Sequence, residues 1–341
     1  MYSHRQIEAV LQAGLSFSAL LMTLFLPIKS YSEQRTPLTF IGAVPLPQVK
    51  GGFDLMAADI NGQRLFLAAQ DNNTLEVIDL ANKKLLRSVP GFNEPKWVVY
   101  RPESNRLYIS NGGDGSVRVL DAQTFVQSKQ YSFREKANNL RYDVSDSLLF
   151  VGVGKTFGEI AIIDAAKDTS VGTITLSAFP KQFEVVADRI YVNVPKANHV
   201  AVIDRKAMKQ IAAWPVAAAH ENVPMGIDQA QQRLFIGCEP GKLAILDMTN
   251  GTSVASLDIS AEPDSIYYDK TRRLIYISCG AGFIDVIRQL DADHYEVVSK
   301  IPTAPGAATA LFIPGLNRYC LAVPQTDKQT AELRLFSTTD K

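Results

Sequence analysis

Cysteine is scarce in this sequence of 341 residues, which contains three, an odd and low number. A disulfide framework therefore does not hold the fold together, and a chain of this length can bury a large core without one. The sequence also lacks net charge, because its 35 basic residues balance 35 acidic ones. With no basic excess to neutralise phosphates, we predict no nucleic-acid partner.

Motifs for catalysis and cofactor binding are missing as well. The sequence has no CxxC, HxxxH or HExxH metal spacing, no CxxCH haem site, no GxSxG elbow and no GxGxxG loop after a strand. Three histidines follow the N-terminal segment, His199, His220 and His294, and their spacing does not suit zinc. We therefore expect no metal and no cofactor.

The N-terminal segment has the pattern of an export signal. Residues 9–28 carry no charge, Arg5 precedes them, and small residues end the segment near Ser32. This order is typical of a secretory signal peptide, which we assign to residues 1–32, with 33–37 as a linker. The alternative is an uncleaved anchor, since twenty uncharged residues can span a bilayer. Either way we predict an exported protein, periplasmic or extracellular, with no membrane contact unless the segment stays uncleaved.

A short apolar strand recurs seven times along the rest of the chain. With positions 65, 107, 148, 190, 234, 275 and 319 as the anchors of its copies, the steps are 42, 41, 42, 44, 41 and 44 residues. Further strands flank each copy, so that four short strands rich in Val, Ile, Leu, Tyr and Phe fill each period. Four strands in a period of this length are typical of an antiparallel propeller blade. We predict an all-β, seven-bladed β-propeller over residues 38–341.

The two ends of the chain complement each other. After Leu335–Ser337 only residues 338–341 remain, so the seventh unit lacks its outer strand. An orphan strand, Leu38–Val44, precedes the first unit. We predict that this N-terminal strand completes the last blade, which closes the ring and removes an exposed sheet edge.

The second unit carries the motif of a known repeat. Tyr108–Asn111 followed by Gly115–Asp121 resembles the YVTN-type β-propeller repeat: an aromatic strand ending in Asn, a turn, then Val-x-Val-Ile-Asp. The resemblance covers essentially residues 38–341, and the late units depart from it at Arg288 and Ser337. It implies a bacterial or archaeal protein that is exported or on the surface. Broader kin include lactonase-like propellers, amine dehydrogenase heavy chains and haem d1 propellers.

Polar residues gather where loops enter the innermost strands, and in a propeller these loops converge on the mouth of the central channel. The candidate ligand-binding residues at these positions are Asp54, Lys96, Asn138, Lys181, His220, Glu221 and Asp264. Their mixed charges suit a small polar ligand or an ion. The plain alternative is a solvated channel whose charges compensate one another. We expect the segment 217–225 to be the longest of these loops, and its His220 and Glu221 are the candidate catalytic residues.

Other recurring residues have structural explanations. An Asp closes the third strand of five units, and a residue that every blade needs is best interpreted as a turn cap; the five are Asp79, Asp121, Asp164, Asp204 and Asp247. Cys238 and Cys279 share the position of Asn111 in adjacent blades, too far apart for a disulfide. Cys320 should lie in the core.

These observations predict a monomeric, non-catalytic scaffold that binds an unknown protein or a small polar ligand at the channel mouth. The resemblance implies a first alternative, a lactonase-like hydrolase. Its chemistry needs a base such as Glu221 or His220 near a cation such as Lys96 or Lys181. A second alternative is a redox partner similar to the amine dehydrogenase heavy chain, with a cofactor supplied by another protein.

Overall fold

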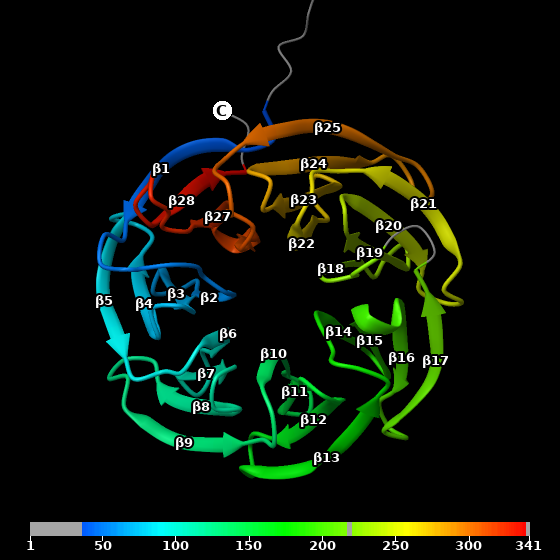
Figure 1. The fold of residues 1–341 in the computed structure, drawn as a ribbon, viewed down its shortest axis with the longest axis horizontal. Coiled ribbons are helices and arrows are strands. Elements are labelled where there is room, and N and C mark those ends of the chain that lie inside the picture. The colour runs from blue at the N-terminus through cyan, green and yellow to red at the C-terminus, as the bar shows by residue number, and fades with distance from the viewer. Residues whose placement is uncertain (1–35, 217–219, 339–341) are drawn as a thin grey trace, which may run out of the picture. The chain divides into compact units, whose positions relative to one another are not determined.

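The computed structural model describes residues 36–216 and 220–338, so the predicted signal peptide, 1–32, lies outside the described residues. Within them the chain forms 28 strands, in seven sheets of four, and two short 3-10 helices. The sheets stand around a central channel as the blades of a ring (Figure 1). The predicted all-β propeller with seven four-stranded blades is confirmed.

Each of the first six blades takes four consecutive strands, which are hydrogen-bonded in chain order. Blade 1 contains β2 (Met56–Asp59), β3 (Arg64–Ala69), β4 (Thr74–Asp79) and β5 (Lys84–Pro90). Blade 2 contains β6 (Pro95–Arg101), β7 (Arg106–Asn111), β8 (Ser116–Asp121) and β9 (Gln127–Ser132). Blade 3 contains β10 (Ala137–Asp143), β11 (Leu148–Gly154), β12 (Gly158–Asp164) and β13 (Thr169–Leu176). Blade 4 contains β14 (Phe183–Val186), β15 (Arg189–Val194), β16 (His199–Asp204) and β17 (Lys209–Pro215), with η1 (Pro195–Ala197) between β15 and β16.

The remaining blades follow the same plan up to the closure of the ring. Blade 5 contains β18 (Met225–Asp228), β19 (Arg233–Cys238), β20 (Lys242–Asp247) and β21 (Ser253–Asp258). Blade 6 contains β22 (Pro263–Asp269), β23 (Leu274–Cys279), β24 (Phe283–Gln289) and β25 (Tyr295–Pro302). Blade 7 contains β26 (Ala310–Ile313), β27 (Arg318–Val323), β28 (Glu332–Ser337) and β1 (Thr39–Pro45), with η2 (Pro314–Leu316) after β26. Neither described helix is long and apolar enough to cross a membrane.

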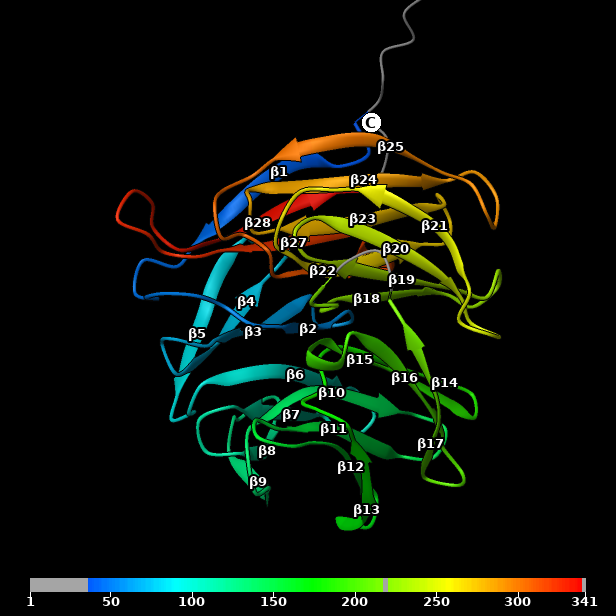
Figure 2. The same cartoon turned by 45° about the vertical axis from the view of Figure 1, so that its right-hand side comes forward.

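The ring is closed by its first and last strands. β1 pairs antiparallel with β28, so that Thr39 lies opposite Ser337 and Pro45 lies opposite Glu332. Figure 2 shows the two strands side by side in the last blade. The predicted closure by the N-terminal strand is therefore confirmed. Blades 6 and 7 are complete despite their departures from the sequence repeat.

The core lies between neighbouring blades. Successive residues of a strand point to opposite faces of the sheet. β3 therefore sends Leu65 and Leu67 into a cluster shared with blade 7 and sends Phe66 into a cluster shared with blade 2. Because both faces are covered, the second strand of each blade is a continuous apolar run rather than an alternating one. This packing explains why that strand gave the clearest repeat in the sequence.

The repeated aspartates cap the turns that leave the third strands. Each carboxylate accepts a hydrogen bond from a backbone N–H two or three residues further on. The distances are 2.9 Å from Asn82 to Asp79, 2.7 Å from Thr124 to Asp121, 2.9 Å from Lys167 to Asp164, 2.9 Å from Ala207 to Asp204 and 2.8 Å from Thr249 to Asp247. Hydrogen bonds lower the pKa of all five carboxyl groups, chiefly from a side chain at Asp79, Asp164 and Asp247 and from the backbone at Asp121 and Asp204. The interpretation of these residues as turn caps is confirmed.

The three cysteines are free and buried. Cys238 ends β19 and Cys279 ends β23, as Asn111 ends β7, which is the equivalence predicted from the repeat. Cys320 lies inside β27 and is fully buried. Burial raises the pKa of the Cys238 and Cys320 thiols to about 12, so these side chains act as apolar core groups.

Candidate functional site

One face of the ring carries the segments that enter the first strand of each blade, together with the turns between second and third strands; we call it the entry face. At the mouth of the channel on this face lies a polar cavity of about 220 Å³. Its lining residues are Phe53, Asp54, Leu55, Gln70, Asn138, Asn139, Lys181, Gln182, Val223 and Asp264. Four predicted residues, Asp54, Asn138, Lys181 and Asp264, thus meet around one cavity. Their role in binding stays a prediction.

Irregularities in the innermost strands aim several side chains at the channel mouth. The pairing of β10 with β11 skips from Ala137 to Leu140, which leaves Asn138 and Asn139 out of register. The pairing of β22 with β23 shifts in the same way at Asp264. Such bulges turn side chains away from the regular alternation.

Lys96 sits at a similar irregularity at the start of β6 and is buried, with its side chain 6% exposed. Its ammonium group donates a hydrogen bond to Oε1 of Gln70 and lies 3.9 Å from a carboxylate oxygen of Asp54. A second carboxylate, that of Glu94, also lies 3.9 Å away. Lys96 therefore stands behind the acidic side of the cavity rather than lining it.

Lys136 joins Lys96 at this point, although sequence reasoning missed it. A Cβ atom placed on Gly112 would lie 2.7 Å from Cε of Lys96 and 3.0 Å from Cε of Lys136. The absence of a side chain at Gly112 thus leaves the space in which the two lysine side chains converge. Burial and the neighbouring charges of Lys96 and Lys181 lower the pKa of Lys136 to about 8.

The acidic residues of the cavity have raised pKa values, in contrast to the lowered pKa of Lys136. Burial, reinforced by the nearby charge of Asp264, raises the pKa of Asp54 to about 7. Lys96, Lys181 and a 2.9 Å hydrogen bond from the Leu55 backbone N–H oppose that shift. Burial also raises the pKa of Asp264, against the attraction of Lys181. The two carboxyl groups are therefore held in a setting that disfavours their charged forms.

Two further residues line the cavity that the sequence did not single out, Asn139 and Gln182. Asn139 is 4% exposed, and its Nδ2 has no hydrogen-bond partner among the described residues. Gln182 donates to the backbone oxygen of Asp264 and accepts from the backbone N–H of Met225, which links blades 4, 5 and 6. Each residue directly follows a predicted one, Asn138 and Lys181, so adjacency was the only signal in the sequence.

His220 and Glu221 are exposed and are not among the residues that line the cavity. The backbone of His220 pairs with Glu239, and the buried Asn222 anchors the following residues to Asn193 in β15. Residues 217–219 lie outside the described residues. The prediction that 217–225 is the longest entry segment is wrong, because the segment 46–55 between β1 and β2 is longer.

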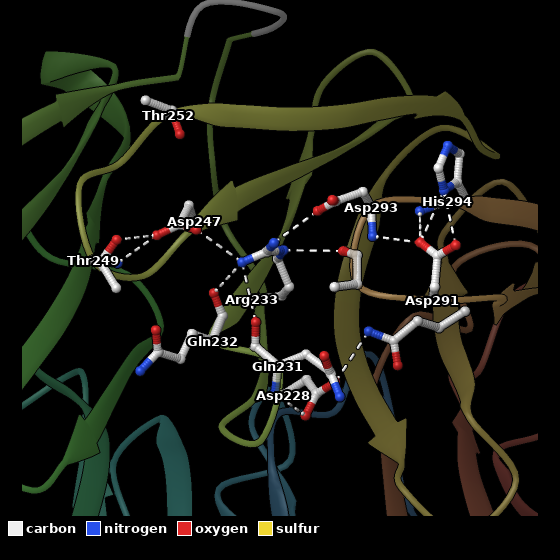
Figure 3. Close-up of polar contacts among 12 residues, drawn as sticks. Asp228, Gln231, Gln232, Arg233, Asp247, Thr249, Thr252, Asp291, Asp293 and His294 are labelled. Atoms are coloured by element: carbon white, nitrogen blue, oxygen red, sulfur yellow. Dashed lines mark hydrogen bonds and ion pairs between the residues drawn. The ribbon is translucent and has the colours of Figure 1, made fainter.

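The remaining histidines are far from a metal-binding arrangement. His199 begins β16 on the entry face, whereas His294 lies in the loop between β24 and β25 on the opposite face, as expected. There His294 pairs with Asp291 at 2.8 Å, and the adjacent Asp293 pairs with Arg233 across the junction of blades 5 and 6 (Figure 3). Within residues 36–216 and 220–338, no group of three or more His, Cys, Asp or Glu residues is arranged to hold a metal ion.

Comparison with known proteins identifies the fold but no family. No protein-family model and no curated protein sequence matches this chain. Among solved structures, the RRP9 WD40 repeats match with a TM-score of 0.75 at 10% identity, over 87% of this chain and 97% of that one. A chain of the mitotic checkpoint complex matches with a TM-score of 0.75 at 12% identity, over 98% of both chains. U3-55K matches with a TM-score of 0.76 at 9% identity, over 87% of this chain and 98% of that one. The chain thus shares its seven-bladed propeller architecture with WD40 repeat structures.

Proposed function

We propose that this protein is an exported, YVTN-type binding scaffold whose ligand or partner binds at the channel mouth of the entry face. The cavity that five blades build there is the observation that carries the proposal. Among the described residues, no carboxylate lies within ion-pair distance of the Lys181 ammonium group, and Asn139 has an unused buried donor. Buried polar groups without partners cost free energy, and a bound ligand would satisfy them.

The similar structures support an interaction role. One of them belongs to a mitotic checkpoint complex, in which a propeller of this architecture takes part in an assembly. A rigid ring with variable loops on one face suits the presentation of a binding surface. The uncharged stretch 9–28 supports export, and the mass of the protein isolated from its own host would test it. Cleavage near Ser32 should remove the first 32 residues, whereas a full-length mass would contradict that part of the proposal.

A thermal-shift screen tests the binding role. Sugars, lactones, amino acids, organic acids and divalent ions should be screened against the purified protein, and we expect at least one class to raise the melting temperature. Lys181→Met should abolish that shift. Lys328→Met is the matched control, because Lys328 is exposed on the same face between β27 and β28. A ligand whose shift survives Lys181→Met would place the binding site elsewhere.

The lactonase-like alternative draws on one observation, the pKa of about 7 that burial gives Asp54 beside Lys96. A carboxylate that titrates near neutral pH can act as a general base, and a nearby ammonium group can stabilise an oxyanion. In this version Asp54 replaces His220 or Glu221 as the base. Hydrolysis of a lactone by the parent protein, lost in Asp54→Asn, would support the alternative. No hydrolysis at high protein concentration would exclude it.

A further inference from the structure

Charges of opposite sign occupy different halves of the channel mouth. The blades follow chain order around the ring (Figure 1), so the blade that supplies a residue fixes its place on the circle. The acidic residues of the cavity come from blade 1, with Asp54, and blade 6, with Asp264, which flank blade 7. The lysine that lines the cavity, Lys181, comes from blade 4, while Lys136 of blade 3 and Lys96 of blade 2 lie outside the lining. The mixed ring is therefore polarised rather than alternating.

The positive half offers hydrogen-bond donors that the fold leaves unused. Lys181 lines the cavity and has no carboxylate within ion-pair distance among the described residues. The unpartnered Nδ2 of Asn139 lines the same cavity from blade 3. Asn138 lines the cavity too, and its amide side chain forms no hydrogen bond within residues 36–216 and 220–338. An ammonium group and amide donors in one small polar cavity are the partners that a carboxylate prefers.

The negative half, formed by Asp54 and Asp264, would be stabilised by an added positive charge. Asp54 and Asp264 line the same cavity, and the charge of Asp264 helps to raise the pKa of Asp54. Lys96, the cation closest to Asp54, is shared with Gln70 and Glu94. A positively charged group placed between the two carboxylates would relieve their repulsion and favour both charged forms.

We propose that the cavity binds a small zwitterion of the α-amino-acid class, with its carboxylate toward Lys181 and Asn139 and its ammonium group between Asp54 and Asp264. This inference rests on the proposed role of the channel mouth as a ligand site. The cavity of about 220 Å³ has room for a compact molecule, since one water occupies about 30 Å³ of liquid. A dicarboxylate would meet the acidic half and a diamine the basic half, so the polarised ring selects against both.

The first test uses the twenty protein amino acids as probes, followed by isothermal titration with each one that raises the melting temperature. We expect binding of at least one small or polar amino acid. For each binder, the amine that lacks its carboxylate and the acid that lacks its amine should bind at least about tenfold more weakly. Equal affinity for either analogue would contradict the zwitterion assignment.

Substitutions on the two halves give the second test. Lys181→Met should weaken the amino acid at least about tenfold while it leaves the affinity for the matching amine nearly unchanged. Asp264→Asn should do the reverse, weakening the amino acid and sparing the matching acid. A substitution that merely disturbed the fold would weaken all three probes together. Lys328→Met should leave all three affinities at the parent value.

Different results would contradict the binding site at the channel mouth and the zwitterion as its ligand. If no amino acid binds at millimolar concentration, the zwitterion inference is wrong. If a sugar or an organic acid binds instead, with an affinity that depends on Lys181, the channel mouth remains the binding site and only the assignment of the ligand class is wrong. An amino acid whose affinity survives both substitutions binds elsewhere, and that result overturns the inference.

Discussion

Asp247 shows how one repeated side chain stabilises a blade. Its carboxylate accepts a hydrogen bond from the Thr249 backbone N–H at 2.8 Å and pairs with Arg233 at 2.9 Å (Figure 3). Asp247→Ala should lower the free energy of unfolding by about 1–2 kcal/mol, as for other lost caps. These contacts lower the pKa of Asp247, so the stabilisation is full above the ordinary value of 3.8 and fades as the pH falls below it.

Denaturant unfolding of Asp247→Ala and Asp258→Ala at neutral pH checks this prediction. Asp258 is the control, because its side chain is 86% exposed. A surface substitution of this kind changes stability little. Equal stability of the two variants would show that the cap contributes nothing to the blade.

Asp54 should affect stability with the opposite sign. Its pKa is raised from 3.8 to about 7, so the folded state binds the proton more tightly than the unfolded state does. The resulting destabilisation begins as the pH rises above 3.8 and is complete above about 7. Burial is the largest cause of this raised pKa and Asp264 adds to it, whereas the charges of Lys96 and Lys181 oppose it.

Asp54→Asn should therefore be more stable than the parent at pH 8 by about 1 kcal/mol or more, and the two should converge near pH 4. Thermal unfolding measured across this pH range provides the check. A variant that is less stable than the parent at pH 8 would mean that Asp54 is held as a favourable ion pair with Lys96. The sign of the difference thus decides whether burial or the ion pair with Lys96 dominates at Asp54.

Only part of this site could be predicted from single residues. The repeat aligns the blades, so counting from the anchor strand led to Asp54, Asn138, Lys181 and Asp264. Bulges in the innermost strands then determine which side chains point into the channel, and no pattern in the sequence predicted these bulges. For that reason the sequence did not point to Asn139, Gln182 or Lys136. It did predict a position at the channel mouth for Lys96, which lies behind the cavity wall.

At the scale of the element, β1 is the strand on which the ring depends. It pairs along β28, and Leu38 and Val44 are buried against blades 6, 7 and 1. Removal of residues 38–44 should expose the edge of β28 and cause aggregation or a large fall in melting temperature. Size-exclusion chromatography and thermal unfolding would measure this. Unchanged melting of a monomeric truncated protein would show that the ring closes without β1.

The strands were predictable because each blade needs its second strand apolar on both faces. That demand recurs in every unit, so the period was visible even where the Asp cap is lost, at Arg288 and Ser337. The segments between blades obey no such demand. Their lengths and contacts are set by local packing, such as that of Asn222 against Asn193. His220 and Glu221 were predicted from the expected length of their loop and from their being a His-Glu pair, and neither feature places them at the cavity.

At the scale of the whole molecule, closure of the ring converts distant parts of the sequence into one site. Asp54 and Asp264 lie more than two hundred positions apart in the chain, yet both line the cavity because blade 7 alone separates their blades. The separation of acidic and basic blades is likewise a property of the circle and is hidden in the linear order. A rigid scaffold of this kind holds its binding groups in place before a ligand arrives.

Native mass spectrometry of the protein purified from its own host tests the central claim, that the channel mouth is a binding site. The parent protein should carry an additional mass from a bound molecule or partner, and the double variant Lys181→Met, Asp264→Asn should lack it while keeping the same circular dichroism spectrum. A bound mass that the double variant retains, or a parent protein that carries none, would contradict the account.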